Sequence, residues 1–203
     1  MSSPSIVYEY GENLYINLTN RCPCTCEFCL RQSSNGVGSA DSLWLEHEPG
    51  APDVMDELRR MDAKSYGELV FCGYGEPFSA FGVMLEVCRG IRLEYKEAVI
   101  RVNTNGLGDL INGREVAPEL VGLVDIISIS LNTSDPGNYV KICKPEYGDQ
   151  AFPAVLRFAE SCKKHVPEVI FSVVDVIPDW DIKACRQIAE LIGVSFRVRH
   201  FED

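Results

Sequence analysis

Short apolar runs alternate along the chain with longer segments of helical periodicity. Six runs have the length and the β-branched or aromatic content of buried strands, and they cover residues 14–18, 68–72, 98–102, 124–131, 168–177 and 194–198. Between them, apolar side chains recur every three or four positions over residues 51–61, 79–93, 149–165 and 179–192, which predicts four amphipathic helices. Such a rhythm of strand, helix and strand is typical of an α/β fold with a parallel sheet.

The run at residues 124–131 departs from a continuously apolar pattern. Ser128, Ser130 and Asn132 alternate there with aliphatic side chains, so the three polar residues are expected to share one face of the strand. A parallel strand that is covered on both faces should be apolar throughout. The polar face therefore indicates the interior of an open barrel, where hydroxyl and amide groups can bind a ligand. Serines that find hydrogen bonds inside an ordinary core are the alternative.

Four cysteines lie within eight residues directly after the first strand. Cys22, Cys26 and Cys29 have the spacing C-x3-C-x2-C, and their soft thiolates suit an iron–sulfur cluster. Three ligands on one loop would leave one iron of a four-iron cubane open. Cys24 lies two residues from a ligand on either side, so we expect it to stay outside the cluster. A four-cysteine zinc site and a disulfide are the alternatives, although a zinc ribbon normally uses two well-separated pairs.

This spacing, with an aromatic residue before the last cysteine, resembles the radical S-adenosylmethionine (SAM) superfamily. A second motif supports the resemblance, because the strand at residues 68–72 runs into a Gly-Tyr-Gly-Glu-Pro loop similar to the superfamily's GGEP motif. The resemblance implies that Cys22, Cys26 and Cys29 hold a [4Fe-4S] cluster. It also implies that Gly73, Tyr74, Gly75 and Glu76 contact the methionine end of SAM and that Phe28 packs near the adenine.

Two further strand ends carry residues that the resemblance assigns to SAM. Asn103 begins an Asn-Thr-Asn-Gly segment, which is also a common turn sequence. Some radical SAM activating enzymes have Asp at the position of Asn103 to hold a monovalent cation, so we expect no cation here. Ser130 and Asn132 correspond to residues that contact the SAM ribose, and residues 174–176 to a backbone segment near the adenine.

The expected architecture is a partial (β/α)6 barrel of the radical SAM type, forming a single domain over residues 1–203. Six strands fall short of the eight strands and roughly 250 residues of a complete barrel. Ligands of such folds bind at the carboxyl ends of the strands. The cysteine loop, the Gly-Tyr-Gly-Glu-Pro loop and the polar strand ends all fall on that rim.

The function implied by the resemblance is reductive cleavage of SAM to a 5′-deoxyadenosyl radical, which abstracts hydrogen from an unidentified substrate. A one-electron donor such as flavodoxin or ferredoxin is the implied partner. The small radical SAM proteins associated with TatD-family hydrolases are the most similar subfamily, which implies a possible TatD-family partner. An activating enzyme that places a radical on a partner protein, and a non-catalytic metal-binding regulator, are the alternatives.

Composition and charge indicate which partners and which cellular location to expect. The 203 residues are 46% hydrophobic and carry a net charge of −11, which disfavours nucleic-acid binding. The sequence has no apolar run of membrane-spanning length and no signal peptide, so a cytoplasmic location is expected. The five cysteines outside the loop are expected to be small core residues, with Cys143 singled out because it follows the fourth strand on the active-site rim: Cys72, Cys88, Cys143, Cys162 and Cys185. Residues 33–39 are rich in turn formers and are expected to form a lid or a connector.

Overall fold

The computed structural model describes residues 4–201. Seven strands form one sheet in the order of the sequence, and all neighbours are parallel except the first pair. The strands are β1 (Val7–Tyr10), β2 (Asn13–Ile16), β3 (Glu68–Phe71), β4 (Val99–Thr104), β5 (Ile126–Ser130), β6 (Glu168–Val174) and β7 (Ser195–Arg199). The six predicted strands and the α/β class are confirmed. β1 was not predicted, and it forms an antiparallel hairpin with β2 through a turn at Gly11, whose φ is +61°.

Six α-helices connect the parallel strands. They are α1 (Ala51–Arg60), α2 (Phe81–Glu94), α3 (Gly108–Asn112), α4 (Pro136–Cys143), α5 (Ala151–Cys162) and α6 (Asp179–Ile192), and short 3₁₀ turns cover residues 30–32, 63–65, 77–80, 117–120 and 148–150. The four predicted helices are confirmed to within a few residues. α3 and α4 were missed because five and eight residues are too few for a clear helical period.

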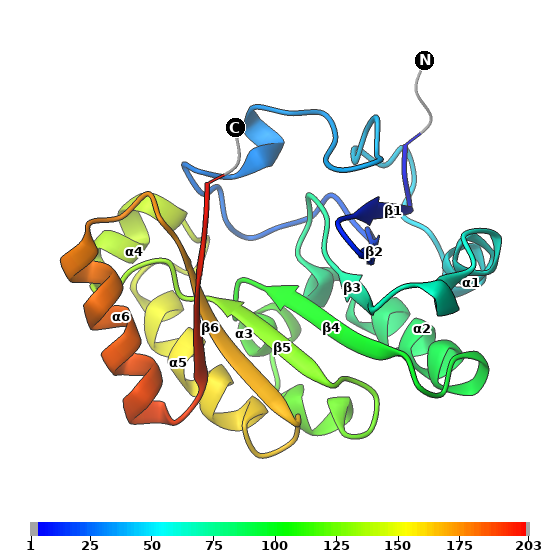
Figure 1. Ribbon diagram of the computed structural model, residues 1–203. Coiled ribbons are helices and arrows are strands. Elements are labelled where there is room, and N and C mark those ends of the chain that lie inside the picture. The colour runs from blue at the N-terminus through cyan, green and yellow to red at the C-terminus, as the bar shows by residue number, and fades with distance from the viewer. Residues whose placement is uncertain (1–3, 202–203) are drawn as a thin grey trace.

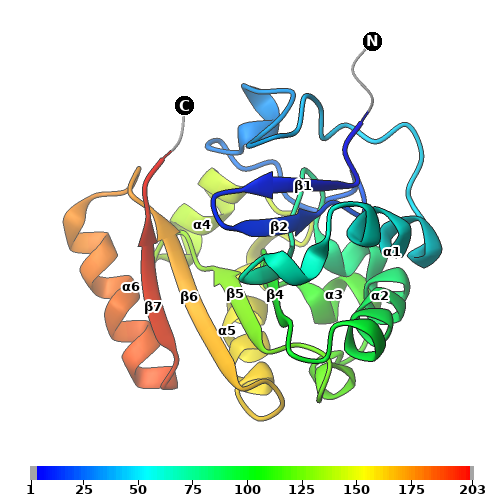
Figure 2. The ribbon, with the colours of Figure 1, turned by 45° about the vertical axis from the view of Figure 1, so that its right-hand side comes forward.

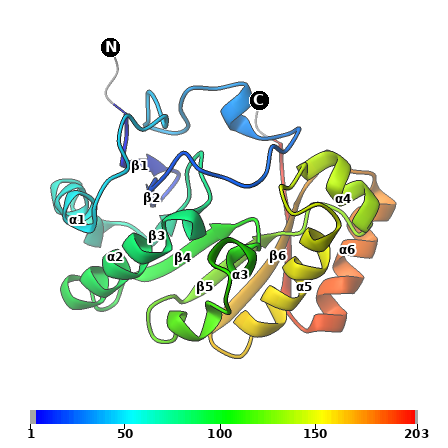
Figure 3. The ribbon, with the colours of Figure 1, turned by 180° about the vertical axis from the view of Figure 1, so that it is seen from behind.

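The two faces of the sheet have different chemistry. In a parallel pair, partners in register share a face, and the helices cover one face of the sheet in Figure 3. Apart from Thr104 at the end of β4, the strand partners on this face are buried apolar residues: Leu14, Ile16, Leu69, Phe71, Ile100, Val102, Ile127, Ile129, Val169 and Phe171. The other face contains most of the polar strand residues, and no helix crosses it in Figure 1. We call this second face the inner face.

The sheet curves into an open, partial barrel of the expected type. Figure 2 shows the β1–β2 hairpin and β7 at the two edges of the sheet. Two strand ends differ from the prediction. β4 continues through Thr104, so Asn103 lies in the strand, and β6 stops at Val174 because the next residues turn toward Pro178, which precedes α6. No helix in the described residues is long and apolar enough to cross a membrane.

Candidate functional site

The cysteine loop follows β2 and is fixed to the end of α4 by backbone hydrogen bonds. The Thr25 N–H donates to the carbonyl of Cys143 at 3.0 Å, and the Glu27 N–H donates to the carbonyl of Ile142 at 2.9 Å. The Arg31 guanidinium donates to the carbonyl of Cys24 at 3.2 Å. These bonds hold the loop across the carboxyl ends of the strands, so the thiols are placed by backbone contacts of both elements.

One loop thiol, that of Cys24, contacts two of the others. The Cys24 thiol donates hydrogen bonds to Cys22 and Cys26, and these bonds raise its own pKa. The hydrogen bond from Cys24 lowers the pKa of Cys22, and a hydrogen bond from Cys143 lowers that of Cys26. Burial raises the pKa of Cys29. Cys22 and Cys26 are therefore the thiols that ionise most readily, while Cys24 is held protonated between them.

Cys143 lies beside the cysteine loop. It is fully buried at the end of α4, as expected of a core cysteine, but its thiol also contacts Cys26 and receives a hydrogen bond from Asn132 Nδ2 at 3.3 Å. Asn132 has a φ of +65°, which turns it out of the alternation of β5 and toward α4. Its Oδ1 is buried without a hydrogen-bond partner. Asn132 thus reaches the rim from a loop, whereas the alternation pattern placed it on the strand face.

The Gly-Tyr-Gly-Glu-Pro loop packs directly on the segment that leads into the cysteines. A Cβ on Gly73 would overlap the side chain of Asn17, and a Cβ on Gly75 would overlap the Thr19 carbonyl and lie 2.8 Å from the carbonyl oxygen of Arg21. The adjacent Glu76 N–H donates to that same Arg21 carbonyl at 2.8 Å. Glycine is required at position 73 because the Asn17 side chain fills the space, and at position 75 because the two loops touch there through their backbones.

The buried carboxylate of Glu76 joins the loops after β3 and β4. It accepts hydrogen bonds from the Thr104 hydroxyl at 2.7 Å, the Asn105 N–H at 2.7 Å and the Phe78 N–H at 3.2 Å. Burial raises the pKa of Glu76 to about 7, although these donors lower it. Because three donors occupy its oxygens, Glu76 holds the loops after β3 and β4 together. A ligand at this part of the rim would therefore bind to the backbone of the Gly-Tyr-Gly-Glu-Pro loop.

The side chain of Tyr74 packs against the connector that follows the cysteine loop. It is buried among Tyr8, Ala40 and Leu43, and its hydroxyl donates to the carbonyl of Ser34 at 2.6 Å. The ring of Trp44 packs edge-on against it with centroids 5.1 Å apart. The hydroxyl of Tyr74 thus ties the turn-rich connector at residues 33–39 at Ser34, and Ala40 and Leu43 just after this connector pack with the Tyr74 ring.

The inner face contains the predicted polar residues of β4 and β5. Ser128 is the register partner of Asn103, and Ser130 that of Ser172, which places all four on this face. Cys72 also belongs here, because Asn103 hydrogen-bonds to its thiol. The expectation that Cys72 sits on an apolar core face is therefore wrong. It follows the buried Phe71 by one residue and so points to the opposite side of the sheet.

Phe28 and the segment after β6 meet on the rim. A hollow of about 250 Å³ is lined by Glu27, Phe28, Ile142, Val176, Ile177 and Phe201. The sequence placed both Phe28 and residues 174–176 near the adenine of SAM, and the fold brings Phe28 and Val176 together.

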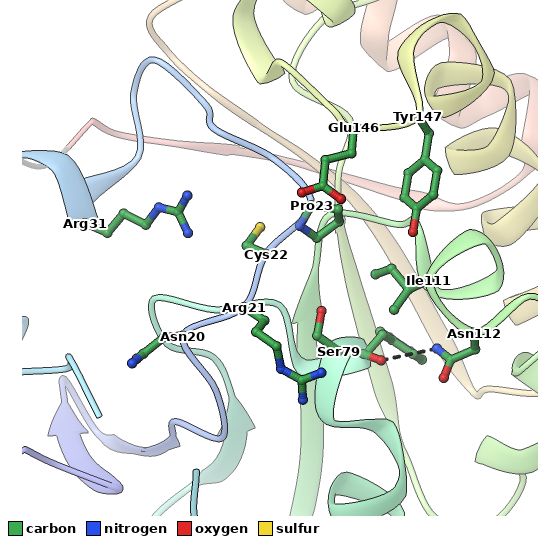
Figure 4. A pocket seen from close by; sticks show the side chains of 11 residues that line it. Asn20, Arg21, Cys22, Pro23, Arg31, Ser79, Ile111, Asn112, Glu146 and Tyr147 are labelled. Atoms are coloured by element: carbon green, nitrogen blue, oxygen red, sulfur yellow. Dashed lines mark hydrogen bonds between the residues drawn. The ribbon is translucent and has the colours of Figure 1, made fainter. Parts of the chain in front are cut away.

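A second hollow of about 520 Å³ opens beside the cysteine loop. Its lining comes from that loop, from residues 78–79, from α3 and from the segment after α4, as Figure 4 shows. Cys22, Arg21 and Arg31 lie on one side of it, and Glu146 and Tyr147 on the other. Asn112 Nδ2 donates to the Phe78 carbonyl at 3.2 Å and fixes its base. Cys22 therefore lines a hollow on this side of the loop.

A family model of the radical SAM superfamily matches residues 16–192, which include all the loops described above. The chain belongs to the radical SAM superfamily. No curated protein matches the sequence.

Several solved structures share the fold at low sequence identity. A radical SAM methyltransferase from Sphaerobacter thermophilus is 15% identical with a TM-score of 0.58, and the match covers 96% of this chain and 68% of that one. SuiB from Streptococcus suis, solved with its precursor peptide SuiA, is 14% identical with a TM-score of 0.66, covering 93% and 39%. The FeFe-hydrogenase maturase HydG from Carboxydothermus hydrogenoformans is 13% identical with a TM-score of 0.60, covering 93% and 44%. The chain thus spans about two fifths of the length of the latter two proteins.

Membership of the radical SAM superfamily implies a [4Fe-4S] cluster and SAM as cofactors. The thiol chemistry of the cysteine loop fits the cluster, and the orphaned Oδ1 of Asn132 fits a polar ligand on the rim. Within residues 4–201, no three His, Cys, Asp or Glu side chains are arranged to hold a metal ion. Cys24 lies between Cys22 and Cys26 and is buried, whereas those two thiols belong to partly exposed residues.

Proposed function

We propose that this chain is a radical SAM enzyme that cleaves SAM reductively and abstracts hydrogen from a substrate held in the open barrel. When bound, the cluster and SAM together supply a 5′-deoxyadenosyl radical. The observation that carries the proposal is the backbone contact between the cysteine loop and the Gly-Tyr-Gly-Glu-Pro loop at Gly75. A cluster held by the first loop would lie next to the backbone of the second.

The proposed cluster ligands are Cys22, Cys26 and Cys29, with Cys24 outside the cluster. The lowered pKa values of Cys22 and Cys26 support this choice, because a thiolate is the metal-binding form. Cys24 is buried and its thiol donates hydrogen bonds to both Cys22 and Cys26, which supports its place outside the cluster. Exposure of Cys29 is intermediate, so its thiol is accessible to an incoming cluster.

The proposed SAM contacts follow the rim from β3 to β6. The backbone of Gly73, Tyr74 and Gly75, held in place by Glu76, would bind the amino group of the methionine portion. Further along the rim, Asn103, Ser130 and Asn132 would reach the ribose, and the hollow that Phe28 shares with Val176 would take the adenine. The protein's part is to bind and orient SAM and to exclude water, while the cofactor carries the difficult step.

The partners proposed for this chain are a one-electron donor such as flavodoxin or ferredoxin and an unidentified substrate, in the cytoplasm. The resemblance to TatD-associated radical SAM proteins adds a TatD-family hydrolase as a proposed partner. Its test is co-purification of such a hydrolase with the tagged chain at a fixed stoichiometry. Absence of the hydrolase from the purified sample, while the chain itself is recovered intact, would contradict that partnership.

Anaerobic reconstitution followed by incubation with SAM and dithionite tests the proposed reaction. We expect 5′-deoxyadenosine and methionine to form in equal amounts. Cys24→Ala should retain the cluster, and Cys26→Ala should lose it. Cys162→Ala is the matched control, because Cys162 is buried in α5 away from the rim. A confirmed cubane that yields no 5′-deoxyadenosine would contradict the proposed function.

A further inference from the structure

The inner face of the sheet carries an unusual concentration of arginine. Arg101 on β4 and Arg197 and Arg199 on β7 all belong to this face by strand register. The three arginines lie close enough to act on the same groups. Burial raises the pKa of Tyr15 and that of Cys72. Against this effect, the positive charges of Arg101 and Arg197 both lower the pKa of Tyr15, and those of Arg101 and Arg199 both lower the pKa of Cys72. In a chain with a net charge of −11, a positive barrel interior is a local feature that the bulk composition does not explain.

Arg101 already has its counter-ion within the protein. Its side chain is only 9% exposed, and Nη2 lies 2.9 Å from Glu68 Oε2 and 3.5 Å from the Tyr15 hydroxyl. Its Nε is buried without a hydrogen-bond partner. The ion pair neutralises one of the three charges near the base of the barrel and leaves one buried donor unused.

Arg199 has no carboxylate partner of this kind, and the acidic groups that act on its charge are the Cys72 and Cys26 thiols and the Tyr15 hydroxyl. Among the described residues it forms no ion pair, and its side-chain hydrogen bond is a neutral one, from Nη2 to the Ser130 hydroxyl at 3.3 Å. Its Nε is buried without a partner. The adjacent carboxylate of Asp175 is occupied on both oxygens, by His200 at 2.7 Å and by the Phe201 N–H at 2.8 Å. Arg199 is therefore a partly buried guanidinium with donor capacity to spare.

The unused hydrogen-bond donors of Arg199 lie at the rim. This residue is the register partner of Val174, the last residue of β6, so it lies at the carboxyl end of the strands where ligands of such barrels bind. Charged groups removed from water are normally paired, and a guanidinium presents parallel N–H groups that match a carboxylate or a phosphate. A bound oxyanion would satisfy both requirements at once.

We propose that Arg199, with Arg197 beside it, forms a subsite for an oxyanion, a carboxylate or a phosphate group, on the substrate. This inference rests on the proposed function, since it takes the barrel interior as the substrate site. It assigns a chemical class to that substrate: a molecule with an acidic group that enters from the open edge at β7. Arg101 and Glu68 form the polar floor below the subsite.

Inorganic phosphate is the probe for this subsite. The reconstituted protein is saturated with SAM under anaerobic conditions, and its thermal unfolding midpoint is followed as phosphate replaces chloride at constant ionic strength. We expect a saturable rise of the midpoint in the wild type and at least a tenfold loss of apparent phosphate affinity in Arg199→Gln. The matched control is Arg114→Gln, because Arg114 is exposed and already paired with Glu119 far from the barrel, and this variant should respond like the wild type.

Equal responses to phosphate in the wild type and in Arg199→Gln would overturn the proposal. A tenfold or greater loss of SAM affinity in Arg199→Gln, measured by equilibrium dialysis, would also overturn it, because Arg199 would then serve the carboxylate of the cofactor. If Arg199→Gln fails to fold, Arg199→Lys takes its place, and at least a threefold weakening of phosphate binding is expected. None of these readouts uses turnover, so a failure of SAM cleavage is seen separately.

Discussion

Gly75→Ala tests whether the site depends on the backbone contact between the cysteine loop and the loop after β3. The new Cβ would overlap the Thr19 carbonyl and lie 2.8 Å from the Arg21 carbonyl oxygen. Both obstacles are backbone atoms, so relief requires the two loops to separate. Separation would break the 2.8 Å hydrogen bond from the Glu76 N–H to the Arg21 carbonyl.

The expected loss of stability follows from these contacts. Overpacking against fixed atoms costs about 1–3 kcal/mol, and the broken backbone hydrogen bond adds about 1 kcal/mol. Replacing glycine reduces the entropy of the unfolded chain, which returns about 0.4–1 kcal/mol. The free energy of unfolding of Gly75→Ala should therefore fall by about 1–4 kcal/mol.

Urea unfolding of the cluster-free protein, followed by far-UV circular dichroism, measures this change. Gly82→Ala is the matched control, because Gly82 lies in the first turn of α2 and its Cβ would meet no atom within 4 Å. That variant should be unchanged or more stable by up to about 1 kcal/mol. A Gly75→Ala variant within about 0.5 kcal/mol of the wild type would refute the claim that the loops touch through their backbones.

Three further substitutions probe the rim. The pKa of Glu76 is raised from its ordinary value of 4.5 to about 7, so the native state binds this proton more tightly than the unfolded state does. The free energy of unfolding should therefore fall by up to about 3 kcal/mol as the pH rises from 4.5 to 7. Urea titrations at several pH values should show a weaker pH dependence in Glu76→Gln than in the wild type. Cys143→Ala removes a hydrogen bond to the Cys26 sulfur, so a redox titration should find a more negative cluster potential, whereas an unchanged potential would contradict that contact. Tyr74→Phe loses the bond to the Ser34 carbonyl, so limited proteolysis should cut residues 33–39 faster, and equal cutting rates would show that the hydroxyl does not anchor this segment.

Much of the scaffold follows from the sequence because local patterns determine it. The apolar runs located all six parallel strands, and α6 was predicted with its observed bounds since its apolar spacing and Gly193 mark both face and end. The hairpin of β1 was missed because the polar Glu9 interrupts a four-residue strand whose partner is antiparallel. Its alternation and the following glycine at position 11 were the available signal.

In the site, too, local sequence patterns predicted some features, whereas contacts between distant segments could not be predicted. The cysteine spacing marks the metal-binding loop, but no local pattern brings Cys143 to Cys26, because that contact depends on how α4 ends against the loop. The direction of Cys72 and Arg199 could have been found from strand alternation, counting from the buried Phe71 and from the Ser128–Ser130 face. The buried role of Tyr74 could not, since its partners lie 30 or more residues away, most of them in a connector without a regular pattern.

A three-cysteine cluster with one iron open to SAM is the centre of the proposed mechanism. Electron paramagnetic resonance of the dithionite-reduced cluster, recorded with and without SAM, tests it most directly, and Cys24→Ala gives the decisive sample because a fourth ligand from Cys24 is then impossible. We predict that SAM changes the g values of the cluster signal in both the wild type and Cys24→Ala. A cubane whose signal is the same with and without saturating SAM would contradict the open iron, because its irons would then all be held by the protein.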